Sequence, residues 1–156
     1  PDLIVMIRDA LRTSGLAPDR LEIEITESTL MRKDDRTIAH LQDLRALGVK
    51  IAMDDFGTGY SSLSYLQTYP IDCIKIDRSF VMTLGESGDA SAIVRAITTL
   101  ATSLGMTTVA EGVETKQQRD TLQALGCTKA QGYYFGRPLP AADALPPLAG
   151  SVVIAA

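Results

Sequence analysis

The sequence predicts an α/β protein whose strands are parallel and whose sheet curves into a barrel. Three observations support this fold class. Segments typical of helices and segments typical of strands alternate along the chain, which is the pattern of a parallel sheet with helical crossovers. Three of the expected helices end in leucine followed by glycine, so the chain carries a weak internal repeat. Two expected strands have charged residues in their middle, which suits a barrel better than an open sheet that is apolar on both faces.

The first half of the chain contains two expected pairs of a helix and a strand. Asp2 can cap the first helix, because its carboxylate can accept a hydrogen bond from the first turn, and Gly15 ends that helix. The second helix begins near residue 34 or 35, carries apolar residues at three-residue steps and ends at Gly48. A strand follows each helix, where apolar and polar residues alternate or an apolar run precedes acidic residues. These strands are expected over residues 21–26 and 49–53.

The second half continues the alternation and ends in a proline-bearing tail from residue 137. Gly105 closes the longest expected helix. Thr115 and Gln118 form a capping box for the last helix, which Gly126 ends. The expected elements are a short helix around 61–67, a strand over 72–77, a helix over 89–104, a strand over 107–110, a helix between 115 and 126, and a strand over 129–135.

Polar residues stand where the expected strands end. The glycines that close three of the helices are each followed, five or six positions later, by a polar residue. Since the carboxyl ends of parallel strands lie at the same edge of a sheet, we expect residues that are far apart in sequence to converge there. The residues expected to converge are Glu24, Asp54, Asp55, Lys75, Glu111 and Gln131.

Four carboxylates near one ammonium group require further positive charge, because like charges repel at short range. All of the candidate ligands are oxygen atoms, which Mg²⁺ and Mn²⁺ prefer. Asp54 and Asp55 are placed to bridge or flank two ions about 3.5 to 4 Å apart, the arrangement used in phosphoryl displacement. His40, the only histidine, lies inside an expected helix, so a histidine-rich zinc site and a Ser-His-Asp triad are excluded.

Each of these residues also has an ordinary structural interpretation. The glutamates of residues 21–26 fit the solvated face of an edge strand, and Asp54-Asp55 fits a turn. Lys75 fits a surface ion pair with Asp72 or Asp77. The acidic residues before the last helix fit its dipole, and the aromatic residues of the last strand fit the core. Together these interpretations require five independent coincidences at successive strand ends, so a functional site is the favoured hypothesis. An unrelated two-metal phosphohydrolase on an open sheet stays open at this point.

Composition limits the possible partners and compartments. The 15 Lys and Arg residues against 19 Asp and Glu residues give a net charge of −4, which disfavours binding to a nucleic-acid polymer. No apolar run approaches the roughly 18 to 20 residues that span a bilayer. Two cysteines without a Cys-x-x-Cys spacing indicate a reducing cytosol. The N-terminus has neither an initiator Met nor the layout of a signal peptide, which suggests a fragment.

Five stretches of the sequence form a recognisable set. They are Leu21–Ser28, Asp54–Leu63, Lys75–Val81, Ala110–Thr115 and Gln131–Phe135. The most specific is the run Asp-Asp-Phe-Gly-Thr-Gly-Tyr-Ser-Ser. Together they closely resemble the EAL-domain family of bacterial cyclic di-GMP phosphodiesterases. The resemblance covers the C-terminal portion of the family's domain, so residues 1–140 are expected to be that portion and residues 141–156 a C-terminal tail.

The resemblance implies a (β/α)8 TIM-like barrel, present here as a partial barrel of about five βα units. It also implies hydrolysis of one phosphodiester bond of cyclic di-GMP to give the linear dinucleotide, with two Mg²⁺ or Mn²⁺ ions. By position, Glu24 and Asp54 resemble ligands of one ion. Asp54 would bridge to the second ion, which Asp55 and Glu111 would hold.

Other positions match further roles in the family. Lys75 resembles the lysine that orients or deprotonates the attacking water, and Glu111 belongs with it to the catalytic set. Gln131 resembles a substrate-binding residue near the metals and the water. The residues that match those which hold or flex the Asp-Asp-Phe-Gly loop are Glu27, Glu114, Gly57 and Gly59.

The Glu-Ala-Leu tripeptide that names the family and an asparagine ligand of an earlier strand do not occur in this sequence. The chain by itself is therefore expected to be inactive, as a piece of a phosphodiesterase. The alternative hypothesis is a non-catalytic module that binds cyclic di-GMP or regulates a partner. The resemblance also implies a homodimer in the full-length protein and a bacterial cytoplasmic location, compatible with the cytoplasmic end of a larger sensor protein.

Overall fold

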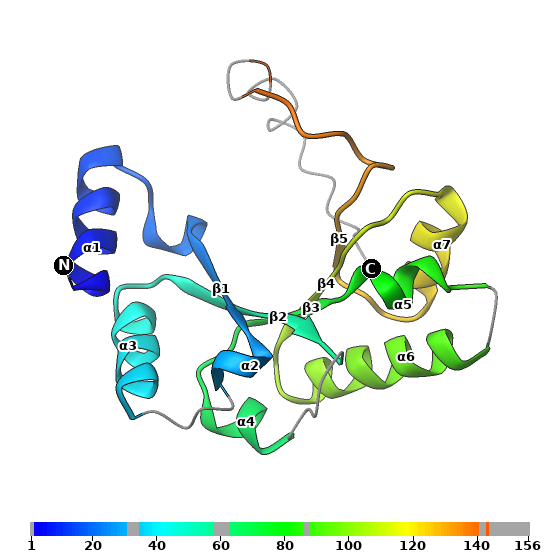
Figure 1. Ribbon diagram of the computed structural model, residues 1–156, viewed down its shortest axis with the longest axis horizontal. Helices are drawn as coiled ribbons and strands as arrows, with labels where there is room; N and C mark the ends of the chain where they lie inside the picture. Colours follow the sequence, from blue (N-terminus) through cyan, green and yellow to red (C-terminus); the bar gives the residue numbers. More distant parts are fainter. Residues whose placement is uncertain (1, 31–34, 58–62, 86–87, 141–142, 144–156) are drawn as a thin grey trace. The chain divides into compact units, whose positions relative to one another are not determined.

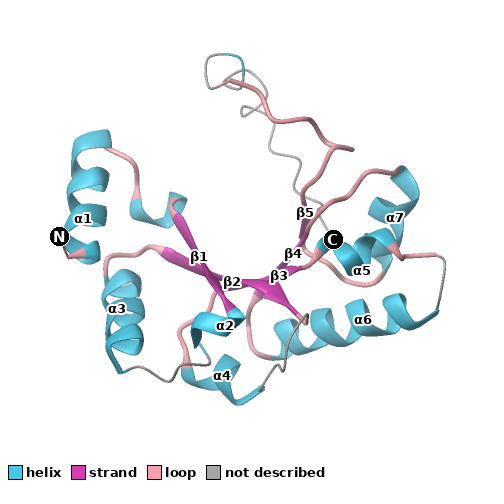
Figure 2. Ribbon diagram, viewed as in Figure 1, coloured by secondary structure: helices cyan, strands magenta, loops and turns pink. Residues whose placement is uncertain are grey.

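The computed structural model describes residues 2–30, 35–57, 63–85, 88–140 and 143. Helices and strands alternate along these residues, as expected (Figures 1 and 2). The elements are α1 (Leu3–Ser14), the 3-10 helix η1 (Pro18–Arg20), β1 (Glu22–Thr26), α2 (Glu27–Leu30), α3 (Asp35–Ala46), β2 (Lys50–Phe56), α4 (Leu63–Thr68), β3 (Cys73–Ile76), α5 (Arg78–Met82), α6 (Gly88–Ser103), β4 (Thr107–Ala110), α7 (Lys116–Ala124) and β5 (Lys129–Ala130).

The five strands form one sheet in the order β1-β2-β3-β4-β5, so each strand pairs with its neighbours in the chain. A parallel sheet with this order, in which helical segments connect successive strands, is the arrangement of a βα barrel. The chain divides into two compact units. The first comprises residues 1–75 and 104–106, and the second comprises residues 76–103 and 107–156.

The first unit is built around β1 and β2. These strands pair in parallel register, from Glu22 opposite Lys50 to Thr26 opposite Asp54. Three successive residues of β2, Ile51 to Met53, are fully buried, while the side chains of β1 alternate between exposed and half-buried. Helix α3 packs against β2 and against α1, whose first turn is capped by the Asp2 carboxylate as predicted. The register places the ends of both strands at the same edge.

In the second unit, α6 packs against β4 and against the short helix α5 (Figure 2). Asp77 caps α5 by accepting hydrogen bonds from the N–H and the hydroxyl of Ser79. The hydroxyl of Ser79 is the main reason why the pKa of the Asp77 carboxyl lies below its usual value. Helices α2 and α5 were not predicted. With 4 and 5 residues, they are too short to show helical periodicity.

The prediction of a strand over 129–135 was wrong, because β5 ends at Ala130. Gly132 has a φ of 152°, and a Cβ atom there would overlap the backbone of Val113. Val113 instead donates a hydrogen bond from its N–H to the carbonyl of Gln131 and accepts one from the N–H of Tyr134. These contacts turn the chain after β5. Tyr133 and Tyr134 are 53% and 40% exposed, so they do not belong to the core.

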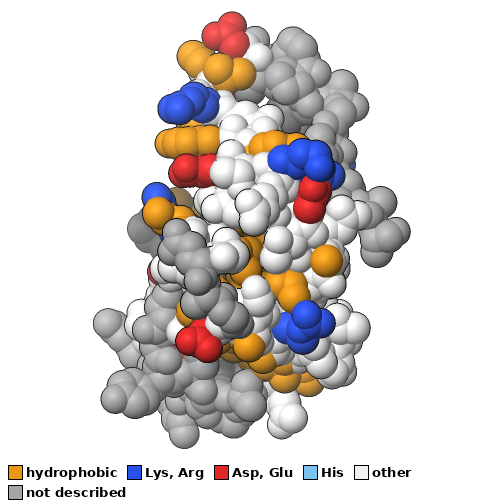
Figure 3. Space-filling model, turned by 90° about the vertical axis from the view of Figure 1, so that its right-hand side faces the viewer, with side chains coloured by type: hydrophobic (Ala, Val, Ile, Leu, Met, Phe, Trp, Pro, Cys, Tyr) orange, Lys and Arg blue, Asp and Glu red, His pale blue; other side chains and the backbone are white. Residues whose placement is uncertain are grey.

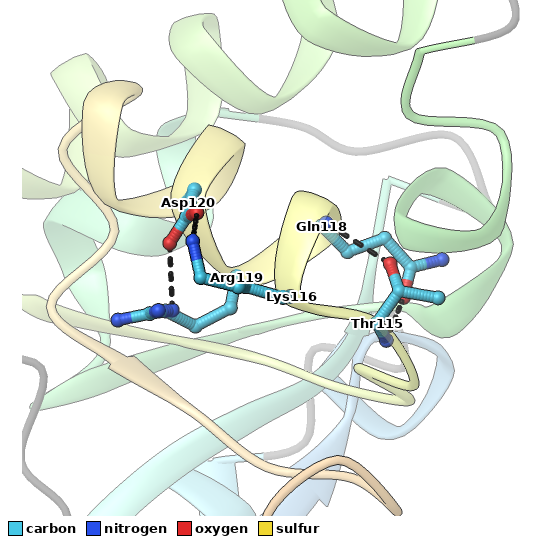
Figure 4. A network of polar contacts seen from close by, with 5 residues as sticks. All are labelled: Thr115, Lys116, Gln118, Arg119 and Asp120. Atoms are coloured by element: carbon cyan, nitrogen blue, oxygen red, sulfur yellow. Dashed lines mark hydrogen bonds and ion pairs between the residues drawn. The ribbon is translucent and has the colours of Figure 1, made fainter.

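The capping box at the start of α7 is confirmed (Figure 4). Thr115 Oγ1 accepts a hydrogen bond of 3.1 Å from the N–H of Gln118, and Oε1 of Gln118 accepts one of 3.0 Å from the N–H of Thr115. Further along the helix, Asp120 pairs with Lys116 at 2.7 Å and with Arg119 at 2.8 Å. The pair with Lys116 is exposed, whereas Nε of Arg119 is buried. An exposed ion pair contributes little, so the backbone contacts of the cap stabilise the helix start more than the pair with Lys116 does.

We expect Thr115→Ala to lower the free energy of unfolding by about 1 kcal/mol, because the N–H of Gln118 loses its acceptor. Urea denaturation followed by circular dichroism measures the change. Thr99→Ala is the matched control. Thr99 is an exposed residue of α6 whose hydroxyl makes no hydrogen bond in the described part of the chain. An equal loss of stability in both variants would contradict the role of the cap.

The surface and the thiols agree with the composition. On the face drawn in Figure 3, basic side chains are interspersed with acidic ones in the described part, which fits the small net charge of −4. Cys73 and Cys127 are both buried and form no disulfide bond, and burial raises the pKa of the Cys127 thiol. Among the described residues, no helix has the length and the apolar character needed to cross a lipid bilayer.

Candidate functional site

Lys75 lies between two carboxylates in the first unit. Its side chain extends from β3 and is only 7% exposed. Its ammonium nitrogen Nζ is 2.7 Å from Oε1 of Glu24 on β1 and 3.1 Å from Oδ1 of Asp54 on β2. Neighbouring strands therefore bring one cation and two anions together, as the topology predicts. The alternative of a surface ion pair with Asp72 or Asp77 is wrong, because Lys75 is buried.

Asp54 presents a buried oxygen atom to this ammonium group. Within the described part of the chain, Oδ1 of Asp54 is within ion-pair distance of Nζ but makes no hydrogen bond. A buried carboxylate oxygen without hydrogen bonds is costly unless a cation stays beside it. This is the environment of an oxygen that binds a cation, and it differs from the solvated environment of a turn residue.

Asp55 adopts an unusual backbone conformation within β2. Its φ is 54°, the only positive φ of a non-glycine residue in the described part of the chain. Aspartate tolerates this left-handed region better than most side chains, but the conformation is still uncommon. Strained residues of this kind concentrate at functional sites. Since Asp54 and Asp55 both lie inside a strand, the interpretation of the pair as an ordinary turn is wrong.

The second unit holds Glu111 and Gln131, which follow β4 and β5. Nε2 of Gln131 donates a hydrogen bond of 2.8 Å to Oε1 of Glu111. Backbone contacts fix both residues, because the N–H of Glu111 donates to the carbonyl of Ile76 and the N–H of Gln131 donates to the carbonyl of Ala110. The carboxyl ends of two neighbouring strands thus place a carboxylate and an amide side by side, as expected.

A cavity of about 440 Å³ lies at this carboxylate–amide pair. Its lining includes Arg78, Tyr133 and Arg137, three residues that we did not predict from the sequence. The guanidinium group of Arg137 is 4.6 Å from the ring centre of Tyr133, a cation–π contact. Two guanidinium groups suit a ligand with anionic groups. The only sequence signal for the arginines was position, because Arg78 lies within the recognised stretch Lys75–Val81 and Arg137 shortly after the stretch Gln131–Phe135.

The structure describes three of the four residues that are predicted to hold or flex the Asp-Asp-Phe-Gly loop. Glu27 is buried, and neither of its carboxylate oxygens makes a hydrogen bond within the described residues. Gly57 follows β2 with a φ of 96°, whereas Gly59 lies outside the described residues. Glu114 is exposed, and its N–H donates to Oε1 of Gln118. The role of these four residues in holding or flexing the loop stays a prediction.

Glu24 and Asp54 fit a divalent cation as a pair. The described residues include no group of three or more His, Cys, Asp and Glu side chains arranged to hold a metal ion. Two carboxylate oxygens nevertheless converge on one positively charged atom, the Nζ of Lys75, which stands in for a cation. The donors are all carboxylate oxygens, as Mg²⁺ and Mn²⁺ prefer.

A larger groove of about 760 Å³ lies between α6 and α7. Its lining includes Arg95, Lys116 and Asp120, and it contains none of the residues predicted from the strand ends. Its polar groups come from exposed helix surfaces, and Lys116 and Asp120 pair with each other (Figure 4). The smaller cavity is therefore the better candidate for a binding site in the second unit, because polar groups from two strand ends converge there.

The sequence matches the family model described as "EAL domain" over residues 1–138. One curated relative is the bifunctional diguanylate cyclase/cyclic di-GMP phosphodiesterase MucR of Pseudomonas aeruginosa, with 48% identity over 143 residues. That match covers 92% of this chain and 21% of the relative. The chain therefore spans only a small part of the length of such a relative.

Solved structures resemble the chain over most of its length. The PaMucR phosphodiesterase in complex with c-di-GMP has a TM-score of 0.85 at 48% identity, covering 90% of this chain and 57% of that chain. Klebsiella pneumoniae BlrP1 in a manganese/cy-diGMP complex at pH 9.0 has a TM-score of 0.82 at 41% identity, covering 88% of this chain and 35% of that chain. The fold is accordingly confirmed as part of an α/β barrel of the TIM-like class.

Proposed function

The chain belongs to the EAL domain family, and from that premise we propose that it forms the C-terminal part of a metal-dependent cyclic di-GMP phosphodiesterase. The reaction is hydrolysis of one phosphodiester bond of cyclic di-GMP to give the linear dinucleotide. Relatives that are named cyclic di-GMP phosphodiesterases and a solved phosphodiesterase in complex with c-di-GMP support this substrate and reaction. The observation that carries the proposal is the buried Lys75 held between Glu24 and Asp54 on neighbouring strands.

The proposed metal ligands are Glu24, Asp54, Asp55 and Glu111, with Mg²⁺ or Mn²⁺ as the two ions. A buried oxygen of Asp54, which makes no hydrogen bond among the residues that the structure describes, faces a cation, and this supports its role. When bound, such ions neutralise charge on the phosphoryl oxygens and make water a better nucleophile at neutral pH. The carboxylates hold the ions and position them relative to the phosphodiester.

The other site residues act on the water and the substrate. Lys75 directs its Nζ toward the attacking water, orienting it or accepting its proton, and Glu111 completes the catalytic set. Gln131 binds the substrate and holds the Glu111 carboxylate through its 2.8 Å hydrogen bond. The cavity beside them supports this role, since Arg78 and Arg137 offer guanidinium groups to an anionic dinucleotide.

The same proposal extends to the rest of the molecule. Glu27 and Glu114 hold the Asp-Asp-Phe-Gly loop, in which Gly57 and Gly59 are the flexible points. Residues 1–140 form the C-terminal part of the catalytic domain, and residues 141–156 form a C-terminal tail. The full-length protein acts as a homodimer in the bacterial cytoplasm. Sedimentation analysis of the full-length protein tests the dimer.

We expect the purified full-length protein to convert cyclic di-GMP to the linear dinucleotide in the presence of Mn²⁺, and to stop when EDTA removes the metal. Separation of the nucleotides by liquid chromatography measures the conversion. Adding Mn²⁺ in excess over EDTA should restore turnover, which controls for unfolding by the chelator. Tight binding of cyclic di-GMP without any product would contradict the enzyme and favour a receptor.

A further inference from the structure

Lys75 occupies the position of a cation between two proposed metal ligands. Its Nζ lies 2.7 Å from Oε1 of Glu24 and 3.1 Å from Oδ1 of Asp54, and its side chain is 7% exposed. Asp54 Oδ1 has no hydrogen bond within the described residues, so the ammonium group is the charge that faces this oxygen. The three groups form a compact cluster in which one positive charge faces two negative charges.

Each member of this cluster needs the others. A buried ammonium group is costly to place in a protein interior unless carboxylates surround it. Two carboxylates that approach the same point repel each other unless a cation lies between them. Lys75 satisfies both requirements at once. The cluster therefore links side chains of β1, β2 and β3 without any metal ion.

A divalent cation bound by the same two carboxylates would lie close to this ammonium group. Mg²⁺ lies about 2.0 to 2.1 Å from its carboxylate ligands. Suppose that Lys75 kept its present contacts while an ion bound Glu24 and Asp54. The ammonium group, with one positive charge, and the ion, with two, would then lie only a few Å apart beside the same carboxylates. Coulomb repulsion at that separation is strong beside an ammonium group that is only 7% exposed. The ammonium group in its present position therefore opposes binding of the metal ion.

Resting on the function proposed above, we infer that Lys75 is a built-in competitor of the metal: the ion binds Glu24 and Asp54 by displacing the ammonium group from them. The displaced side chain is then available to the attacking water. The exchange gives Lys75 two successive functions. Before the metal binds it stabilises the carboxylate pair, and afterwards it takes part in hydrolysis.

Lys75→Met tests this inference, because methionine keeps the length of the side chain and removes its charge. Without substrate, the variant of the full-length protein should bind Mn²⁺ about tenfold or more tightly than the unaltered protein, since the carboxylates no longer have to be vacated. The free Mn²⁺ signal in electron paramagnetic resonance measures the affinity directly, independently of turnover. Circular dichroism establishes that the variant is folded.

Lys50→Met is the matched control. Lys50 also lies in the first unit and also pairs with an aspartate, at 3.9 Å from Oδ1 of Asp72. Its removal changes the net charge of the protein by the same amount but vacates neither Glu24 nor Asp54. We expect its Mn²⁺ affinity to stay within about twofold of the unaltered protein. An equal gain in both variants would overturn the inference, because it would reveal a general charge effect.

The remaining outcomes separate the inference from the proposed function. Equal or weaker Mn²⁺ binding by Lys75→Met, with binding by the unaltered protein intact, overturns the competition alone. No Mn²⁺ binding by any variant overturns the metal site and the competition together. If Lys75→Met fails to fold, a crystal structure of the unaltered protein with Mn²⁺ tests the inference instead. We expect Nζ of Lys75 to lie more than about 4 Å, the limit of an ion pair, from the carboxylate oxygens of Glu24 and Asp54. Contacts that are retained in the presence of Mn²⁺ would overturn the inference.

Discussion

Asp54→Asn should abolish hydrolysis by the full-length protein, with kcat lowered about a thousandfold or more. The substitution removes a charge from the one residue that is proposed to contact both ions. It also replaces a buried carboxylate oxygen that makes no hydrogen bond in the described part of the chain and lies 3.1 Å from Nζ of Lys75. An amide is a much weaker ligand for a hard cation than a carboxylate. Both metal binding and the chemical step therefore lose a contribution that no nearby group replaces.

Asp72→Asn is the control for this prediction, because it removes the same charge from a residue just before β3. Oδ2 of Asp72 accepts a hydrogen bond of 3.0 Å from the N–H of Ile51, and Oδ1 pairs weakly with Lys50. The asparagine oxygen can still accept from Ile51. We expect the free energy of unfolding to fall by about 0.5 to 1.5 kcal/mol while turnover stays within about twofold.

Steady-state kinetics at saturating Mn²⁺ and cyclic di-GMP distinguishes the two aspartates. Measured at saturation, kcat reports the loss in the chemical step apart from a simple loss of affinity. A thousandfold loss in Asp54→Asn with near-normal turnover in Asp72→Asn supports the topological argument for the site. Similar losses in both variants would mean that charge or stability, and not position at the strand end, determines activity.

Local signals account for the part of the fold that could be predicted. The caps formed by Asp2 and by Thr115 need only residues within one turn, and both are confirmed by hydrogen bonds. The end of β5 depends instead on the backbone of Val113, about twenty residues away in sequence, which no local pattern contains. Helices α2 and α5 escaped prediction because 4 or 5 residues cannot display an amphipathic period.

The residue types of the site could be predicted from the sequence, but the burial of its side chains could not. Parallel topology alone indicated that Glu24, Asp54 and Lys75 converge, and their distances confirm it. The burial of Lys75 depends on how neighbouring strands and helices pack around β3, which single-sequence patterns do not report. The left-handed backbone of Asp55 likewise arises from tertiary constraint, since aspartate adopts this region only occasionally.

Lys75→Ala should remove turnover, with kcat lowered about a hundred- to ten-thousandfold, while cyclic di-GMP still binds. Nζ is the group proposed to orient the attacking water or accept its proton, so its loss affects the chemical step. The proposed substrate contacts come from other groups, among them Gln131 and the arginines that line the cavity in the second unit. Isothermal titration calorimetry with cyclic di-GMP, in the presence of Ca²⁺, measures binding. Steady-state kinetics in the presence of Mn²⁺ measures catalysis separately.

Lys50→Ala controls for the loss of a positive charge. This lysine is half-exposed and lies at the opposite end of β2 from Asp54, so turnover should stay within about twofold. If Lys75→Ala lost substrate binding in proportion to turnover, Lys75 would hold the substrate and would not act on the water. The combination expected here is more specific: Lys75 variants bind the metal more tightly, bind the substrate and fail to turn it over. A residue that merely stabilised the fold would weaken all three together.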